Sequence, residues 1–310
     1  MKKSFFLIIL ISSIFSAYAT HNLSGYISTK HVSGLEYEIT VTIIADEASP
    51  AVDRRDIAIN YGDNTRQDTI FVSSQVPIQQ GQLRLLERKF VTKHTFPGPA
   101  DYFIRIEVPN RSANIVNINN SINIPFYIST SFKVSPFQNI SNHTPSISSS
   151  LVTHTGVNQP FIYNLAAHDI DGDFLTYHLV PTKGPNGLNA PGYFIPSGMS
   201  IDLINGELNW HPQNTGTYVF TIEITECRNE NFISTTNVDF MVFVTDNSSG
   251  NPSMFMGNFL TDTNRLGNIS FTLFPGDTLN LNVQEANGND ITALIEKFIT
   301  DKEISNVEGK

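Results

Sequence analysis

Apolar and polar side chains alternate along several short stretches of this chain, and that alternation constrains the fold more than any other feature. In residues 36–44, one face of an extended segment carries Tyr37, Ile39, Val41 and Ile43. The opposite face carries Glu38, Thr40 and Thr42. The pattern recurs in residues 57–61, 102–108, 218–224 and 240–244. Because successive side chains of a strand point to opposite faces, each stretch is predicted to be a half-buried antiparallel strand.

Clusters of turn-forming residues separate these stretches, and almost no helical periodicity accompanies them. The clusters lie at residues 62–64, 97–99, 171–172, 205–206 and 214–216. Short strands joined by frequent turns are typical of β-sandwiches. The predicted fold class is therefore all-β, with tandem antiparallel Ig-like β-sandwiches, an incomplete third module and a short C-terminal helix.

The charge and the cysteine content exclude several classes of protein. The chain has 310 residues and a net charge of −10, which argues against a nucleic-acid partner. Its single cysteine, Cys227, excludes a disulfide framework and a cysteine-based zinc site. We expect Cys227 to be a half-buried strand thiol, and the alternative is a reactive or intermolecular thiol.

The first 19 residues have the features of a secretory signal peptide. Lys2 and Lys3 precede an apolar run of 11 residues at 5–15, and residues 17–19 form an Ala-Tyr-Ala cleavage site. The run is shorter than the ~20 apolar residues that a membrane span needs, and no longer one follows. We therefore expect export through the periplasm to a secreted or cell-surface location, without a membrane span.

Two polar, irregular segments divide the rest of the chain. They lie at residues 136–150 and 246–252, and both are rich in Ser, Asn and Pro. The predicted organisation is a signal peptide at 1–19, a first β-sandwich at 20–138, a second at 139–245 and a truncated third module with a helical tail at 246–310.

The first sandwich resembles the polycystic-kidney-disease (PKD) repeat. Residues 59–64 are Ile-Asn-Tyr-Gly-Asp-Asn, residues 94–98 are His-Thr-Phe-Pro-Gly, and a Tyr-led alternating strand follows at 102–108. Asn64 stands where the repeat has a second Gly, a mild change because Asn tolerates left-handed turns. In physical terms, a strand ends near residue 61 and Asp63 accepts hydrogen bonds from turn amides. A catalytic acid is the alternative role for Asp63.

The second sandwich resembles a cadherin-like or putative-Ig repeat of bacterial surface proteins. Three elements carry the resemblance in the expected order: Asp-Ile-Asp-Gly-Asp-Phe-Leu-Thr-Tyr at 169–177, Gly-Glu-Leu-Asn-Trp-His-Pro at 206–212 and Gly-Thr-Tyr-Val-Phe at 216–220. The chain's one tryptophan, Trp210, is expected to anchor the core between two sheets. A sugar-stacking platform is the alternative.

The order of these segments resembles the N-terminal part of large secreted surface proteins of gliding bacteria. Those relatives end in a gliding-motility-associated C-terminal domain that directs type IX secretion, and no such domain is visible in this sequence. The resemblance implies a non-catalytic, adhesin-like or spacer protein. Its expected partner is a cell-surface or extracellular protein or polysaccharide.

The tail partly repeats the second sandwich. Residues 276–292 echo residues 160–176 at a constant offset of 116, as if a third module were beginning. Residues 291–299 then change to helical spacing. A truncated product or fragment explains the unclosed module, and a C-terminal docking helix is the alternative.

The strongest candidate site is the alternating carboxylate set Asp169, Asp171 and Asp173. Three carboxylates in one turn can supply oxygen ligands to calcium, although the glycine of an EF-hand loop is missing. The alternative is an Asp-Gly turn whose carboxylates accept hydrogen bonds from turn amides. In the tail repeat Asn287 and Asn289 replace Asp171 and Asp173, which keeps the turn chemistry, loses the charge and favours the turn interpretation.

The sequence contains none of the common catalytic motifs that would indicate an enzyme. Histidine spacings typical of metal sites, phosphate-binding loops and nucleophile elbows are missing from the sequence. The main rival function is a carbohydrate-binding accessory module, which predicts exposed aromatics in a row, with Tyr26, Phe103 and Tyr193 as candidates. A non-binding fragment of a larger surface protein is a further alternative, and an enzyme fragment would instead show an acidic cleft.

Overall fold

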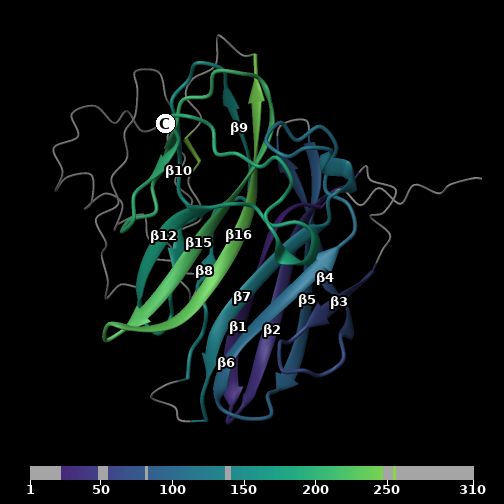
Figure 1. Cartoon of the computed structure of the whole chain (residues 1–310), viewed down its shortest axis with the longest axis vertical. Coiled ribbons are helices and arrows are strands. Elements are labelled where there is room, and N and C mark those ends of the chain that lie inside the picture. The colour runs from purple at the N-terminus through teal and green to yellow at the C-terminus, as the bar shows by residue number, and fades with distance from the viewer. Residues whose placement is uncertain (1–21, 48–54, 81–82, 137–140, 247–253, 256–310) are drawn as a thin grey trace, which may run out of the picture.

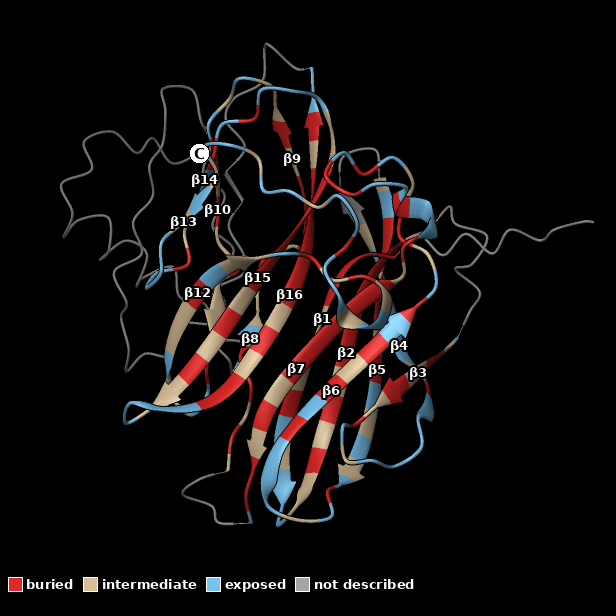
Figure 2. Ribbon diagram, viewed as in Figure 1, coloured by how far each residue is buried: buried red, intermediate tan, exposed pale blue. Residues whose placement is uncertain are grey.

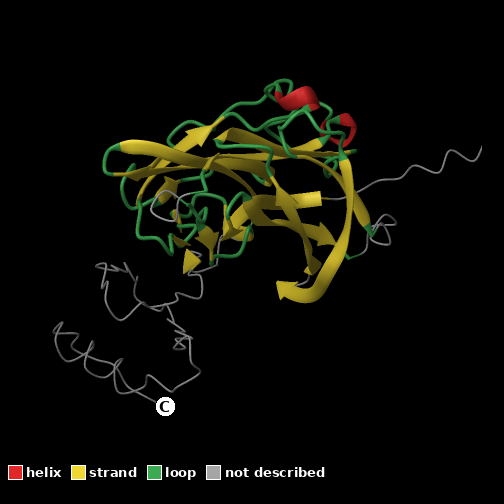
Figure 3. Cartoon of the chain, turned by 90° about the horizontal axis from the view of Figure 1, so that it is seen from below, coloured by secondary structure: helices red, strands yellow, loops and turns green. Residues whose placement is uncertain are grey.

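A computed structural model describes residues 22–47, 55–80, 83–136, 141–246 and 254–255, and within them the fold is built almost entirely of strands (Figure 1). Two short 3₁₀ helices, η2 (Ser121–Asn123) and η3 (Pro185–Gly187), lie together at one edge of the molecule (Figure 3). The all-β prediction is confirmed. The predicted signal peptide, the third module beyond residue 255 and its helical tail lie outside the described residues.

Within the described residues, the N-terminal unit contains seven strands. They are β1 (Asn22–Ser33), β2 (Glu36–Asp46), β3 (Asp56–Asn60), β4 (Asp68–Gln80), β5 (Leu83–Thr95), β6 (Ala100–Val108) and β7 (Phe126–Val134). They pair in the order β1-β2-β5-β4-β3-β6-β7, with antiparallel neighbours throughout. The expected strands near 36–44, 57–61 and 102–108 are thus confirmed as β2, β3 and β6.

The alternation in β2 produces the core that the sequence predicted, but only along part of the strand. The inward side chains of Tyr37, Ile39, Val41 and Ile43 are buried in the core of this unit. Thr42, expected on a polar face, is also buried. Nearby Ile44 packs into the core cluster of the C-terminal unit, together with Leu23 and Leu85. The second face of this end of the strand is therefore covered by the neighbouring unit, which local alternation does not reveal.

The C-terminal unit combines short strands with one long hairpin. Its strands are β8 (Ser146–Ile147), β9 (Val152–Gly156), β10 (Phe161–Tyr163), β11 (Ala167–His168), β12 (Phe174–Val180), β13 (Ser200–Ile201), β14 (Leu208–Trp210), β15 (Gly216–Arg228) and β16 (Asn231–Thr245). One sheet continues as β16-β15-β12, a second runs β13-β14-β10-β17 with β17 at Met254–Phe255, and β8 pairs with β11.

Trp210 lies in the core of this unit, as expected. It is 5% exposed, and its ring meets those of Phe161, Tyr218 and Phe220 edge-to-face. Such edge-to-face contacts stabilise aromatic clusters beyond the burial of their area. Burial of this kind leaves no platform on which a sugar could stack, so the structure supports the core-anchor prediction.

The hairpin strand β16 belongs to both units. Near its beginning, Ser234–Thr236 pair with Thr130–Phe132 of β7, and near its end Met241–Thr245 pair in parallel with β9. Between these stretches, Asp239 is bridged to Gly25 of β1. A side chain at Gly25 would clash with the carbonyl oxygen of Thr42 on β2, so glycine permits the close approach of β1 and β2 at this position. Figure 2 shows buried residues continuing from β1 and β7 into β16.

Candidate functional site

The candidate site is built on the turn between β11 and β12. The Asp169 carboxylate accepts a hydrogen bond at Oδ1 from the backbone N–H of Asp173, at 2.7 Å, and the Asp169 carbonyl accepts one from Gly172. Gly172 has a φ of +78°, a conformation that favours glycine. Asp169 therefore plays the turn-capping role that the Asp-Gly sequence indicated.

The other two aspartates of the predicted set are held by Arg228, by the His143 ring and by a backbone amide. Asp171 accepts hydrogen bonds from the backbone N–H of His143 at 2.8 Å and faces its Nδ1 at 3.0 Å. Arg228 donates to both oxygens of Asp173, from Nε at 2.7 Å and from Nη2 at 2.6 Å. This bidentate pair raises the pKa of Arg228. The turn is thereby tied to β15 and to the segment that enters the unit.

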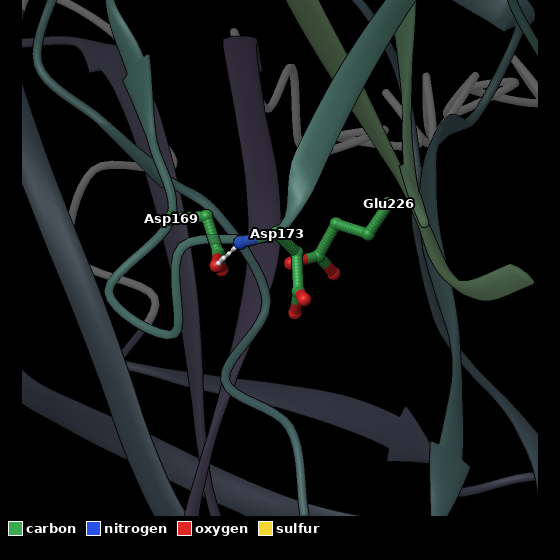
Figure 4. A group of neighbouring side chains, drawn as sticks. All are labelled: Asp169, Asp173 and Glu226. Carbon is green, nitrogen blue, oxygen red and sulfur yellow. Dashed lines mark hydrogen bonds between the residues drawn. The ribbon is translucent and has the colours of Figure 1, made fainter. Parts of the chain in front are cut away.

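Glu226 completes the site, and the sequence prediction missed it. Its carboxylate lies close to those of Asp169 and Asp173, with one oxygen from each residue within 4.8 Å of the others (Figure 4). Asp171 is not part of this group. The signal that points to Glu226 is its place in β15. It follows the inward-facing Ile222 and Ile224 at the same two-residue interval, so an acidic residue occupies a core position.

One oxygen of the Glu226 carboxylate accepts hydrogen bonds, and the other accepts none from the described residues. Oε2 accepts hydrogen bonds from Asn142 Nδ2 at 3.0 Å and from the Ser234 hydroxyl. Among the described residues, Oε1 of Glu226 and Oδ2 of Asp169 have no hydrogen-bond donor. Burial, together with the neighbouring Asp169 carboxyl, raises the pKa of Glu226 to about 9. Near neutral pH, and without a cation, Glu226 therefore carries a proton that it can share with Asp169.

A second acidic side chain occupies a turn in the N-terminal unit, where Asp63 follows β3. Its Oδ1 accepts hydrogen bonds from the backbone N–H and the hydroxyl of Thr65, and its Oδ2 lies 2.7 Å from His94 Nε2. The His94 ring stacks on Tyr61 with centroids 3.8 Å apart. Burial alone would raise the pKa of Asp63, but these hydrogen bonds outweigh it and lower the pKa. The expected bond from a turn amide is confirmed.

A buried ion pair lies where the two units meet. Arg111, in the segment between β6 and β7, places Nη2 2.7 Å from Asp239 Oδ2 on β16, and both side chains are at most 1% exposed. Arg111 also donates to the carbonyl of Lys183, and its guanidinium lies 5.0 Å from the centre of the Phe126 ring. The Thr221 hydroxyl donates to the other oxygen of Asp239. Residues distant in sequence are thus held together by charge and hydrogen bonds.

The predicted aromatic row is not assembled. Tyr26 and Tyr193 pack against the core cluster of the C-terminal unit, and the Tyr193 hydroxyl is buried. Phe103 is exposed on β6, with the Arg105 guanidinium over its ring. Because two of the three rings pack against the core, they do not form an exposed platform with Phe103. Cys227 is a free thiol of intermediate exposure, which confirms the expected half-buried strand cysteine.

The comparisons with known proteins concern the C-terminal unit and the fold. Residues 144–245 match the family model described as "Putative Ig domain". The structure titled "Tandem Ig repeats of Dlar" is 9% identical and is matched over 72% of this chain and 98% of its own, with a TM-score of 0.24. The N-terminal Ig1-2 module of the Drosophila receptor protein tyrosine phosphatase DLAR is 11% identical. It is matched over 73% of this chain and 96% of its own, with a TM-score of 0.25. The sequence has no match among curated proteins.

The match over residues 144–245 supports an Ig-like module in the C-terminal unit of this all-β chain. In the part of the chain that the structure describes, no helix has the length and apolar character that a membrane crossing requires.

Proposed function

We propose that the chain is a non-catalytic modular protein of the cell surface or extracellular space, in which the two units act as one rigid spacer that displays adhesive loops. The observation that carries this proposal is the shared strand β16, which pairs with β7 and β1 of one unit and with β15 and β9 of the other. Domains joined only by a linker usually move relative to each other. A common strand suppresses that motion and lets the pair hold a fixed length.

The buried contact between Arg111 and Asp239 supports the same role. A buried charge is costly unless its partner is in place, so separating the two units would leave both groups without compensation. The ion pair therefore favours a single arrangement of the units. Core residues of both units, including Leu23 and Leu85, pack in one cluster across the same junction. A rigid pair of this kind transmits force and presents its loops at a set distance.

Exposed apolar side chains in loops supply surfaces for contact. Ile170 is 73% exposed and Leu188 is 68% exposed, and both lie in loops of the C-terminal unit. Loops on a rigid scaffold are where binding residues concentrate. The partner we propose is a cell-surface or extracellular protein or polysaccharide.

The route to the surface rests on the sequence. We propose that residues 1–19 direct export through the periplasm, which agrees with the Ig-like module because such modules are common in extracellular proteins. The PKD-like motifs and their order support a place among the surface proteins of gliding bacteria that use type IX secretion. Antibody labelling of intact cells that produce the full chain tests this placement. Labelling only after the cells are permeabilised would contradict it.

The rigid-spacer proposal predicts how the full chain unfolds. Calorimetry is expected to show one transition for the described units, and Arg111→Met is expected to lower the free energy of unfolding by about 3–5 kcal/mol, because Asp239 is left buried without a counter-charge. Arg84→Met is the matched control. It removes the ion pair between Arg84 and Glu47, in which the Arg84 side chain is 72% exposed. The free energy of unfolding is therefore expected to change by less than about 1 kcal/mol.

Separate unfolding of the two units in the wild-type chain would contradict the proposal. So would an Arg111→Met variant no less stable than Arg84→Met.

A further inference from the structure

We propose that the carboxylates of Asp169, Asp173 and Glu226 bind one calcium ion between the β11–β12 turn and β15. The three groups come from two segments, the β11–β12 turn and β15, which lie more than 50 positions apart in the sequence, and the fold places one oxygen of each within 4.8 Å of the others. Figure 4 shows the three side chains converging on the same space. This set differs from the sequence-predicted set, because Glu226 takes the place of Asp171.

Unpartnered oxygens inside this group point to a ligand. Glu226 is 0% exposed and Asp169 is 6% exposed, yet Glu226 Oε1 and Asp169 Oδ2 lack a hydrogen-bond donor among the described residues. The two carboxyl groups hydrogen-bond to each other only when one of them is protonated. Two ionised carboxylates that face each other out of water are strongly destabilising. A cation between them supplies the missing partner for both oxygens.

The charge around the site also leaves room for a cation. Arg228 neutralises Asp173 through two hydrogen bonds and lies 3.4 Å from Asp171. Within the described residues it makes no hydrogen bond to Asp169 or Glu226. Each carboxylate oxygen has two lone pairs, so Asp173 can hold Arg228 and a metal ion at the same time. A divalent ion therefore compensates negative charge that the single arginine does not reach.

The donor chemistry selects calcium among the common divalent ions. The three ligands are carboxylate oxygens, which are hard donors, and the group contains neither a thiolate nor an imidazole, the donors that zinc prefers. Calcium accepts six to eight oxygens in irregular geometry, whereas magnesium requires a near-ideal octahedron. The neighbouring Asp171 and Arg228 side chains are 22–23% exposed, so water can reach this edge and complete the coordination.

An ion here would strengthen the joint between the two units. Glu226 already holds Asn142, and two residues later Thr144 exchanges hydrogen bonds with Thr29 of β1, at 2.7 Å and 3.0 Å. Calcium would fix Glu226 to the β11–β12 turn. The segment from Asn142 to Thr144 would then be held by Glu226 at one end and by Thr29 at the other. This inference does not depend on the spacer proposal, because binding is measured on the ion and not on rigidity.

The experiment adds calcium chloride to the purified full chain after treatment with a chelator. Isothermal titration calorimetry and the melting temperature are measured for the wild type, for Glu226→Gln and for Glu223→Gln. Glu223 lies on the same strand but faces the other side of the sheet, so it is the matched control. We expect calcium to bind and raise the melting temperature of the wild type and of Glu223→Gln, and Glu226→Gln to lose at least tenfold in affinity.

Wild-type protein that neither binds calcium nor melts at a higher temperature in millimolar calcium overturns the inference. Equal calcium responses of Glu226→Gln and the wild type also overturn it. If Glu226→Gln does not fold, Asp169→Asn is used in its place. Its side-chain oxygen still accepts the Asp173 N–H while the charge is lost, and we expect the same loss of affinity.

Discussion

Asp63 in the N-terminal unit and Glu226 in the C-terminal unit are both acidic side chains with at most 1% exposure, but their surroundings differ. Asp63 has donors on both oxygens, from Thr65 and from His94. Glu226 has donors on one oxygen only, and its other oxygen has none. The pKa values move in opposite directions as a result, downward for Asp63 and upward for Glu226. The supply of donors therefore separates a structural carboxylate from one that can receive a ligand.

Of the two carboxylates, removal of Asp63, which has donors on both oxygens, is expected to have the larger effect on stability. Asp63→Ala is expected to lower the free energy of unfolding by about 1–3 kcal/mol, because the Thr65 N–H and His94 lose a charged hydrogen-bond acceptor. Urea denaturation measures the change. Asp68→Ala, at a nearby exposed position, is the control and is expected to cost less than about 1 kcal/mol. Similar losses for the two variants would show that Asp63 is not a structural anchor.

Removal of the Glu226 charge in the C-terminal unit is expected to raise the free energy of unfolding or to leave it almost unchanged. Without calcium, Glu226→Gln is expected to leave the free energy of unfolding within about 1 kcal/mol of the wild type or to raise it, because an amide can donate to Asp169 while Asn142 and Ser234 keep a neighbour. Chelator-treated protein in urea provides the measurement. A loss as large as that of Asp63→Ala would make Glu226 a structural carboxylate like Asp63.

The smallest expected effect lies in the acid range. Because the folded-state pKa of Asp63 lies below its ordinary value of 3.8, Asp63 contributes stability above that value, and the contribution is lost as the pH falls through the folded-state pKa. Asp63→Ala should therefore show a shallower loss of stability below pH ~4 than the wild type. Melting temperatures measured from neutral to acid pH test this. Parallel curves for both proteins would contradict the assignment.

Local patterns in the sequence predicted the strands, the turns and the core position of the tryptophan, because these depend on residues close together in the chain. Alternation located β2, β3, β6, β15 and β16, and the Gly-Asp-Asn and Asp-Gly motifs located the two acidic turns. The core position of Trp210 followed from its place in the Gly-Glu-Leu-Asn-Trp-His-Pro motif at 206–212, which resembles an Ig-like repeat. Each of these features is decided by side chains within a few residues of one another.

Contacts across long sequence distances were not predictable in the same way. Thr42 is buried although alternation placed it on a polar face, and the partner of Arg111 is Asp239, more than 120 positions away. Glu226 was detectable only as an acidic residue at an inward position of a strand, without any hint of which groups it meets. Asp171 was assigned to the calcium set because it shares a turn with Asp169, but the fold directs it to His143 and Arg228. Pairing of strands decides such neighbours, and one sequence does not encode it locally.

The most direct test of the difference between the two carboxylates is a crystal structure of the protein grown in calcium. We expect an ion between Asp169, Asp173 and Glu226, with carboxylate oxygens about 2.3–2.6 Å away, and no ion at Asp63. A direct contact between the carboxyl groups of Asp169 and Glu226, with no ion density between them at millimolar calcium, would contradict it.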